Sequence, residues 1–359
     1  MIGLYFHIPY CRVICPYCDF VKKRTNGDVP GTFVDALLRE IETYDGPTEV
    51  SSIFFGGGTP SLLTPDDTER IFATLNANFS LASPEISIEV NPDDVTAEQL
   101  TLWRNVGVNR LSLGVQSFDD EVLKFLGRCH DRTAAHNACK LIADRFENWG
   151  LDLIFGCKPP DSWASSVQTM LDYDPPHVST YGLTYEPNTP FWNQRNTAID
   201  DDITLEQYRL ADTTLSEYNH YEVSNFAKPG FESTHNLIYW RNEQYAGFGP
   251  GAVSYIGEQR ITNTRYIDQY LSDPLADRET EDLTLDEQKI ETLIQRFRTR
   301  EGIHQSNYDD RFGAILIDDF GDALESLVKR GLLERTGDHY APTMKGYELN
   351  NEIGLALIP

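Results

Sequence analysis

Six short apolar runs separated by amphipathic helical stretches are the feature that most constrains the fold of this chain. The runs are residues 2–8, 49–55, 84–90, 107–115, 149–155 and 177–184. Each has the length of a strand and is followed by enough residues for a crossover helix, which is typical of repeated βα units around a parallel sheet. Capping residues such as Thr64 and Thr96 indicate helix starts. We therefore expect an α/β fold, with a partial (β/α)6 TIM-like barrel over residues 1–185.

The remaining chain divides into two further segments. Residues 186–280 have no clean period, and we expect them to form a barrel extension and connecting region that covers the barrel mouth. In residues 281–359, Thr284 caps one predicted helix, and residues 331–338 have the pattern of a strand and turn. One further helix is expected to bury Phe312, Leu316, Ile317, Phe320, Leu324 and Leu327. Helices followed by a β wing predict a winged-helix-like α+β domain.

The charge of the chain argues against a nucleic-acid partner. Lys and Arg number 30 against 56 Asp and Glu, a formal net charge of −26. Even the winged-helix-like segment 281–359 holds 16 acidic and 9 basic residues, so 9 − 16 gives −7, the wrong sign for phosphate contacts. The sequence has neither an apolar run of membrane-spanning length nor a charged-then-apolar leader, so we expect a cytoplasmic protein that is not integral to a membrane.

Three of the six cysteines follow the first predicted strand closely. Cys11, Cys15 and Cys18 have the spacing C-x3-C-x2-C, and no fourth cysteine or histidine follows nearby. A cluster held by three thiolates keeps one iron free to bind a substrate or cofactor, whereas four thiolates close the cluster. A zinc site that uses His7 as the fourth ligand remains an alternative, and a disulfide frame is disfavoured without a secretion signal. We expect the open iron–sulfur cluster.

Polar and glycine residues follow the other predicted strands, at the end where parallel barrels bind ligands. The segment 56–60, Gly-Gly-Gly-Thr-Pro, permits positive φ and close backbone approach to an amino-acid head group, although a flexible turn would also contain glycine. Glu89 and Asp152 stand alone in apolar strands, where a carboxylate needs a hydroxyl or an ammonium as partner. Each could be a satisfied core group, but together with Gln116 and Arg128 they predict one polar ring at one barrel mouth.

Five motifs carry a resemblance to a known family. They are His-Ile-Pro-Tyr-Cys at 7–11, Phe-Gly-Gly-Gly-Thr-Pro-Ser at 55–61, Glu-Val-Asn-Pro at 89–92, Asn-Arg-Leu-Ser-Leu-Gly-Val-Gln-Ser-Phe at 109–118 and His-Asn-Leu-Ile-Tyr-Trp at 235–240. With the cysteine spacing, they resemble the radical S-adenosylmethionine (SAM) superfamily, in the branch of the oxygen-independent coproporphyrinogen III dehydrogenases and the HemW heme chaperones. The resemblance implies a radical SAM barrel whose 4Fe-4S cluster is bound by Cys11, Cys15 and Cys18, with S-adenosylmethionine on the fourth iron. Implied cofactor contacts are Tyr5, Tyr17, Gly57, Gly58, Thr59, Glu89, Gln116, Arg128 and Asp152.

Two features favour the chaperone side of this branch. The dehydrogenases carry a fourth cysteine two residues after the third and an arm before the first strand, whereas this sequence has Phe20 there and starts almost at the strand. The segment at His235 resembles the chaperone motif whose histidine is implicated in holding heme, and Tyr239 and Trp240 could flank the macrocycle. A packed histidine among aromatic residues is the alternative. Val253 stands where relatives usually have histidine, which weakens the case for a second imidazole.

The resemblance implies two functions. The first is a heme chaperone that binds heme and delivers it to recipient hemoproteins, with peripheral contact to membrane-bound acceptors and a homodimer both left open. The second is an oxygen-independent coproporphyrinogen III dehydrogenase, which uses the radical for oxidative decarboxylation. Cys129, Cys139 and Cys157 are scattered, and we expect them to be buried, inert thiols.

Overall fold

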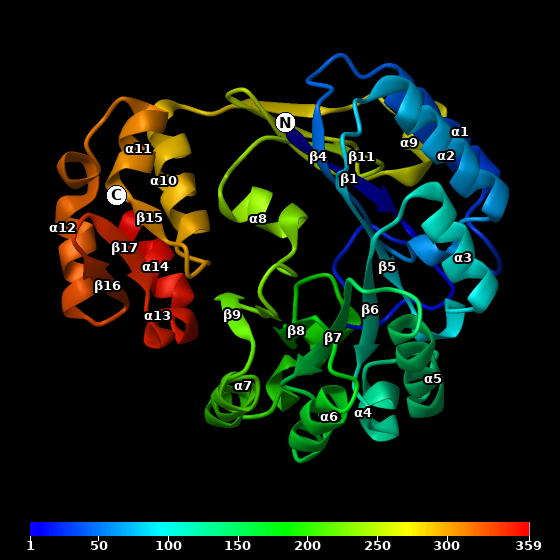
Figure 1. Ribbon diagram of the computed structural model, residues 1–359, viewed down its shortest axis with the longest axis horizontal. Coiled ribbons are helices and arrows are strands. Elements are labelled where there is room, and N and C mark those ends of the chain that lie inside the picture. The colour runs from blue at the N-terminus through cyan, green and yellow to red at the C-terminus, as the bar shows by residue number, and fades with distance from the viewer. Residues whose placement is uncertain (359) are drawn as a thin grey trace.

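An open, curved sheet of twelve strands organises the protein in this computed structural model, which describes residues 1–358 (Figure 1). Seven neighbouring strands at its centre are parallel. In sheet order these are β11 (Tyr245–Phe248), β1 (Ile2–Ile8), β4 (Val50–Gly57), β5 (Glu85–Val90), β6 (Arg110–Gln116), β7 (Trp149–Phe155) and β8 (His177–Gly182). The sheet does not close on itself, so the predicted partial barrel is confirmed. The strand expected from residue 107 begins at Arg110, because Gly107 has a φ of 105° and ends the preceding helix.

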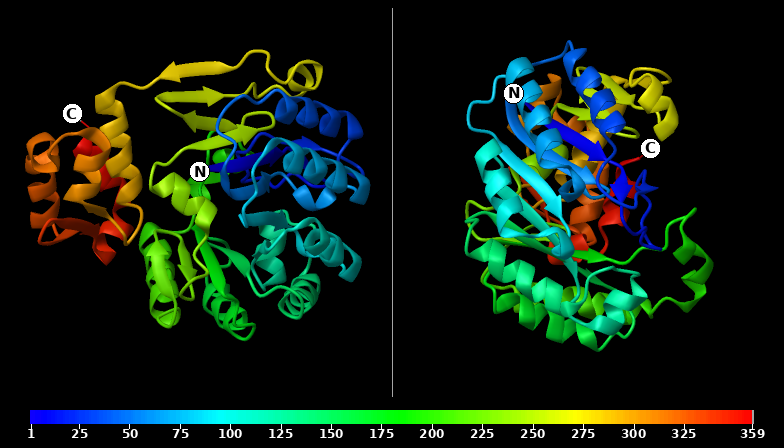
Figure 2. Two further views of the ribbon diagram at one scale, coloured as in Figure 1. Left: turned by 45° about the horizontal axis from the view of Figure 1, so that its top comes forward. Right: turned by 90° about the vertical axis from the view of Figure 1, so that its right-hand side faces the viewer.

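Helices cover the outer face of the sheet, as Figure 2 shows from two further directions. They are α1 (Gly31–Glu42), α2 (Pro65–Asn78), α3 (Ala97–Val106), α4 (Asp120–Phe125), α5 (Arg132–Ala143), α6 (Ser162–Leu171) and α7 (Asp201–Thr214). Thr64 and Thr96 cap α2 and α3 by accepting hydrogen bonds from backbone N–H groups three residues on, as their positions predict. Beneath α1, the Phe6 ring stacks between Phe55 and Phe248 at centroid distances of 4.9 Å, which ties three adjacent strands into the core.

The segment that lacked a clean period extends both edges of the sheet with antiparallel strands. Strands β10 (Asn225–Ala227) and β9 (Asn219–Glu222) follow β8, and β12 (Val253–Ile256), β13 (Gln259–Thr262) and β14 (Glu279–Asp282) follow β11. Between these strands lie the 3-10 segment η3 (Pro190–Thr197) and the short helices α8 (Thr234–Trp240) and α9 (Ile267–Ser272). The Phe191 N–H donates to the Pro16 carbonyl at 3.1 Å, so η3 contacts the loop that carries the cysteines.

The C-terminal part forms an α+β domain with its own core, which confirms the expected class. Its elements are α10 (Leu285–Arg296), β15 (Ile303–His304), α11 (Gln305–Phe312), α12 (Leu316–Lys329), β16 (Leu333–Thr336), β17 (His339–Pro342), α13 (Met344–Glu348) and α14 (Asn350–Leu357). The three strands pair in the order β15-β17-β16, the wing of a winged-helix arrangement. The prediction of one helix across residues 312–327 is wrong: Gly313, with a φ of 61°, ends α11, and Ile317 is 40% exposed.

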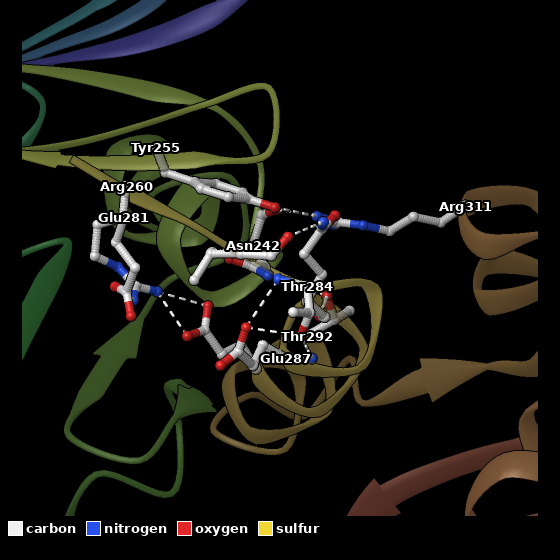
Figure 3. A network of polar contacts seen from close by, with 11 residues as sticks. Asn242, Tyr255, Arg260, Glu281, Thr284, Glu287, Thr292 and Arg311 are labelled. Carbon is white, nitrogen blue, oxygen red and sulfur yellow. Dashed lines mark hydrogen bonds and ion pairs between the residues drawn. The ribbon is translucent and has the colours of Figure 1, made fainter.

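Polar contacts join this domain to the sheet extension (Figure 3). The Asn242 side-chain amide donates to the Thr292 hydroxyl at 3.0 Å, and the Arg311 guanidinium donates to the Asn242 carbonyl at 2.7 Å. Arg260 of β13 pairs with Glu291 of α10 at 2.6 Å. No helix within residues 1–358 has both the length and the apolar character needed to cross a bilayer.

Candidate functional site

The three clustered cysteines lie just beyond the C-terminal end of β1. Cys11 ends the short strand β2 (Tyr10–Cys11), which pairs with β3 (Lys23–Arg24), and Cys15 and Cys18 lie in the loop between these strands. The Cys18 N–H donates to the Cys15 carbonyl at 3.2 Å, which closes a tight turn. All three thiols are free and partly exposed. A backbone hydrogen bond therefore orders the turn between Cys15 and Cys18, and all three sulfur atoms lie where a ligand can reach them.

The donor set fits an open cluster better than a single metal ion. Within residues 1–358, no group of three or more His, Cys, Asp and Glu side chains is gathered around one ion position. His7, the fourth ligand of the zinc alternative, has Nδ1 at 3.0 Å from the Tyr5 hydroxyl and Nε2 at 2.7 Å from the Val21 carbonyl oxygen. Both ring nitrogens are engaged, so the zinc site lacks its fourth ligand. Three thiols without a fourth partner suit a cluster in which each thiolate binds a separate iron.

The glycines after β4 are required by close packing against β1. A Cβ on Gly58 would lie 2.5 Å from the Ile8 carbonyl oxygen, and one on Gly57, whose φ is 100°, would lie 2.4 Å from the His7 ring. The Gly58 N–H donates to the Ile8 carbonyl at 2.8 Å. The Gly57 N–H donates to Glu89 Oε2 at 3.1 Å. These contacts fix the segment, so it is not a flexible turn, and they hold the Glu89 carboxylate beside it.

Two acids face each other across the inner side of the sheet. The Ser112 hydroxyl of β6 lies between Glu89 of β5 and Asp152 of β7 and donates to Asp152 at 3.0 Å. Burial, followed by the charge of Asp152, raises the pKa of Glu89 to about 7. Burial likewise raises the pKa of Asp152. Partly buried carboxylates of this kind gain most from an ammonium group or from hydroxyl donors, so the pair offers a site for a cationic or polyhydroxy ligand.

Arg128 links the cysteine loop to the strand ends. Its guanidinium donates to the Asn91 side-chain oxygen at 2.5 Å, to the Gly114 carbonyl at 3.0 Å and to Cys15 Sγ at 3.7 Å. Gln116, at the end of β6, adopts a φ of 66°, a left-handed conformation that is uncommon for a residue with a side chain. Such outliers concentrate at functional sites, where the surrounding structure holds them in place.

The other predicted cofactor contacts lie around this centre. Thr59 is buried and its hydroxyl accepts a hydrogen bond from the Asn91 amide at 3.2 Å. The Tyr17 ring packs beside Phe191 of η3 with centroids 6.3 Å apart. The Tyr5 hydroxyl meets His7, but its ring lies 6.3 Å from Phe54 and 6.4 Å from His235, so Tyr5 stands between the cysteine loop and His235. Asn91 and Ser112 were not among the predicted site residues, although both bond to members of the site. Ser112 interrupts an apolar strand as Glu89 does, and that signal could have identified it.

His235 lies at the opposite end of the barrel. Its backbone N–H donates to Glu85 at the start of β5 at 3.1 Å, and its Nδ1 is 2.8 Å from the Ser52 hydroxyl near the start of β4. Nε2 is 2.9 Å from the Tyr239 hydroxyl, and the ring is 0% exposed. Ser52 and Gly57 are five residues apart on β4, or about 17 Å at the usual strand rise. The structure therefore does not bring His235 to the cysteine loop.

The aromatic residues after His235 are also packed. The Tyr239 and Tyr245 rings meet edge to face at 4.6 Å, and the Arg298 guanidinium lies 4.7 Å from the centre of the Trp240 ring. Both residues are only partly buried, and these contacts occupy the Tyr239 ring edge and one face of Trp240. The expectation of three buried thiols elsewhere is correct for Cys139 and Cys157, but Cys129 is exposed because it lies in the loop after α4.

Comparisons with known proteins agree with this architecture. The family model of the radical SAM superfamily matches residues 5–159, and that of the HemN C-terminal domain matches residues 283–349. The chain is 35% identical to the heme chaperone HemW of Bacillus subtilis, with 98% of each chain covered. It is 34% identical to the heme chaperone HemW of Escherichia coli, covering 96% of this chain and 95% of that protein.

A solved structure has the same fold over almost the full length. Coproporphyrinogen III oxidase (HemN) from Escherichia coli, a radical SAM enzyme, superposes with a TM-score of 0.86 at 25% identity. The match covers 99% of this chain and 89% of the enzyme. The fold alone thus does not distinguish heme chaperones from coproporphyrinogen oxidases, whereas the two full-length relatives named above are heme chaperones. The chain belongs to the HemW heme chaperone family of the radical SAM superfamily.

Proposed function

We propose that this protein is a heme chaperone that carries a 4Fe-4S cluster and S-adenosylmethionine and delivers heme to recipient hemoproteins. The observation that carries the proposal is the loop with three thiols. Arg128 joins this loop to the end of β5 by donating to Cys15 and to Asn91. The full-length relatives compared above are named heme chaperones. Recipients in this proposal include membrane-bound hemoproteins reached from the membrane surface.

Cys11, Cys15 and Cys18 would hold the cluster, and a reduced cluster of this type supplies an electron that can cleave the sulfonium of S-adenosylmethionine. Gly57 and Gly58 would approach the methionine end of that cofactor through their backbone. Glu89 and Asp152 would accept hydrogen bonds from its ammonium or ribose hydroxyls, because both carboxyls are partly buried and such donors would offset the burial that raises their pKa. Contacts from Tyr5, Tyr17, Thr59, Gln116 and Arg128 complete the proposed site.

Phe20 favours the chaperone over the dehydrogenase. It occupies the position of the fourth cysteine of the dehydrogenases, and its side chain is 63% exposed and offers no metal donor. A second candidate function is nevertheless supported by a specific observation, the full-length structural match to coproporphyrinogen III oxidase. In that case the same cluster and cofactor would serve the oxidative decarboxylation of coproporphyrinogen III.

The axial ligand of the heme stays a prediction. Ligation through His235 Nε2 requires that this nitrogen leave the Tyr239 hydroxyl, because iron needs a free lone pair, whereas Nδ1 can keep its bond to Ser52. The proposal of heme binding does not depend on that residue, and variants of it separate the two questions.

One experiment tests the proposal against its alternative. The protein is reconstituted anaerobically with iron and sulfide, titrated with hemin while the Soret band is followed, and assayed in parallel for turnover of coproporphyrinogen III with S-adenosylmethionine and a reductant. We expect saturable hemin binding without protoporphyrinogen formation. Turnover of coproporphyrinogen III would overturn the chaperone assignment.

A matched pair of variants tests the cluster itself. Cys15→Ser should lower the iron and sulfide content, whereas Cys129→Ser, which changes an exposed thiol outside the loop, should leave it unchanged. Equal iron content in both variants would contradict the assignment of the ligands.

A further inference from the structure

A surface depression adjoins the cysteine loop. Its volume is about 590 Å³, within the range of small-molecule sites. One wall is the segment that follows Cys18, and the other is formed by Arg265, Tyr266 and the first turn of α9. The lining residues are Val21, Lys22, Lys23 and Arg265–Gln269. Because β3 pairs with β2, with Arg24 opposite Cys11, the depression lies directly beside the strand that carries the first thiol.

Its cations are unusual in a chain with a net charge of −26. Arg265 is exposed, and within residues 1–358 no carboxylate or other hydrogen-bond acceptor binds its guanidinium. The Lys22 ammonium donates only to the backbone carbonyls of Cys18 and Phe20. Lys23, by contrast, is paired with Asp268 at 2.8 Å. Two uncompensated positive charges therefore lie at one concave surface, where they favour an anion.

The same depression has an apolar side. The Tyr266 side chain is 71% exposed, and Val21 and Ile267 are partly buried in the walls. Large exposed aromatic side chains are a feature of sites that bind flat ligands, because the ring supplies contact area at a low entropy cost. Concavity and this small volume fit a small amphipathic molecule better than a protein partner, whose standard interface buries about 800 Å² on each side.

We propose that this depression holds the carboxylate edge of heme, with Arg265 and Lys22 paired to the propionates and Tyr266 against the macrocycle. This inference rests on the proposed heme-binding function and locates it on the surface beside the cluster loop. Arg265 and Tyr266 are already exposed, whereas the Lys22 ammonium must leave the Cys18 and Phe20 carbonyls to pair with a propionate. The proposed contact does not involve His235, which is buried at the far end of the strands.

The test compares hemin with its dimethyl ester, in which both propionate charges are removed. The protein, reconstituted with its cluster, is titrated with each porphyrin, and dissociation constants are obtained from the Soret band. We expect the dissociation constant of the ester to be at least about fivefold higher than that of hemin. A fivefold change corresponds to the loss of one partly exposed ion pair, which contributes about 1 kcal/mol. Arg265→Glu should weaken hemin binding by a similar factor and should reduce the difference between hemin and ester. Arg265→Gln should give an intermediate affinity.

Arg104→Glu is the matched control. It makes the same charge change at an exposed arginine of α3 without an ion-pair partner in the described chain, and it should leave hemin affinity unchanged. Tyr266→Ala should weaken hemin and ester equally, because it removes only the apolar contact.

The outcomes separate the two proposals. If the parent protein binds no hemin, the proposed function and this inference fall together. If it binds hemin and the ester equally, or if Arg265→Glu behaves like Arg104→Glu, only the location proposed here is overturned. Loss of cluster reduction by an acidic flavodoxin in Arg265→Glu, with hemin affinity intact, would also overturn it by assigning the depression to a protein partner.

Discussion

Replacing His235 by alanine tests how much this buried residue stabilises the end of the barrel at which β4 and β5 begin. The imidazole bonds to Ser52 and Tyr239 and stacks on Phe54 with centroids 5.2 Å apart. His235→Ala leaves two buried hydroxyls without their partner, at roughly 1–3 kcal/mol each, and opens a cavity next to Phe54. Since part of this loss is recovered by relaxation or entering water, we expect the free energy of unfolding to fall by about 3–5 kcal/mol.

Urea unfolding followed by circular dichroism measures this change, and Ser52→Ala is the partial perturbation. Ser52→Ala removes one of the two hydrogen bonds and little volume, so it should cost about 1–2 kcal/mol. The double variant should be less destabilised than the sum of the single variants, because both remove the same bond. A loss below about 1 kcal/mol in His235→Ala would refute the account of a buried, doubly bonded ring.

The pH dependence gives a second readout of the same residue. Burial lowers the pKa of His235 to about 3, whereas the unfolded imidazole titrates near 6.5. Between these values the unfolded state binds the additional proton, so His235 makes the protein less stable as pH falls from 6.5 toward 3, by at most about 1.4 kcal/mol per pH unit. His235→Ala should remove this component of the pH dependence. If the parent and the variant had the same slope, the imidazole would not be held neutral.

Hemin titration of folded His235→Ala then decides between a structural role and a ligand role. Retained affinity would remove His235 from the heme site, whereas loss of affinity with a native circular dichroism spectrum would support ligation through a rearranged α8.

Three further predictions concern other parts of the molecule. Gly58→Ala should prevent S-adenosylmethionine binding in equilibrium dialysis and destabilise the protein, because its Cβ would lie 2.5 Å from the backbone oxygen of Ile8; unchanged binding would contradict the close approach. Glu89→Gln should flatten the stability profile between pH 4.5 and about 7, where the parent loses stability as pH rises because the folded carboxyl keeps its proton longer than the unfolded one; an unaltered profile in urea unfolding would refute the raised pKa. Arg311→Ala should accelerate proteolytic separation of the C-terminal domain, since it removes the bond to the Asn242 carbonyl, and equal cleavage rates would show that this contact does not hold the domain.

Much of the fold was predictable from local sequence. Six of the seven central strands, all but β11, follow from the apolar period. The caps at Thr64 and Thr96 and the capping box at Thr284 follow from hydrogen bonds between residues three apart. The break at Gly313 had a local signal in the glycine itself, but the apolar period ran across it and favoured one continuous helix.

The short edge strands were not predictable in the same way. Strands β9 to β14, apart from β11, have three or four residues each, too few to show an apolar period, and β10 and β12 reach the sheet only by pairing with β8 and β11.

The sequence by itself determined the chemistry that this chain can offer: three thiols without a fourth, two acids in apolar strands and glycines where a backbone must approach closely. Only the tertiary structure decided which of these groups meet. The tertiary structure placed Arg128 between Cys15 and Asn91, and it placed His235 at the end of the barrel where β4 begins. The physical reason lies in the parallel sheet. Residues at the C-terminal ends of different strands become neighbours although they are distant in sequence. The two ends of any one strand, by contrast, stay a full strand length apart.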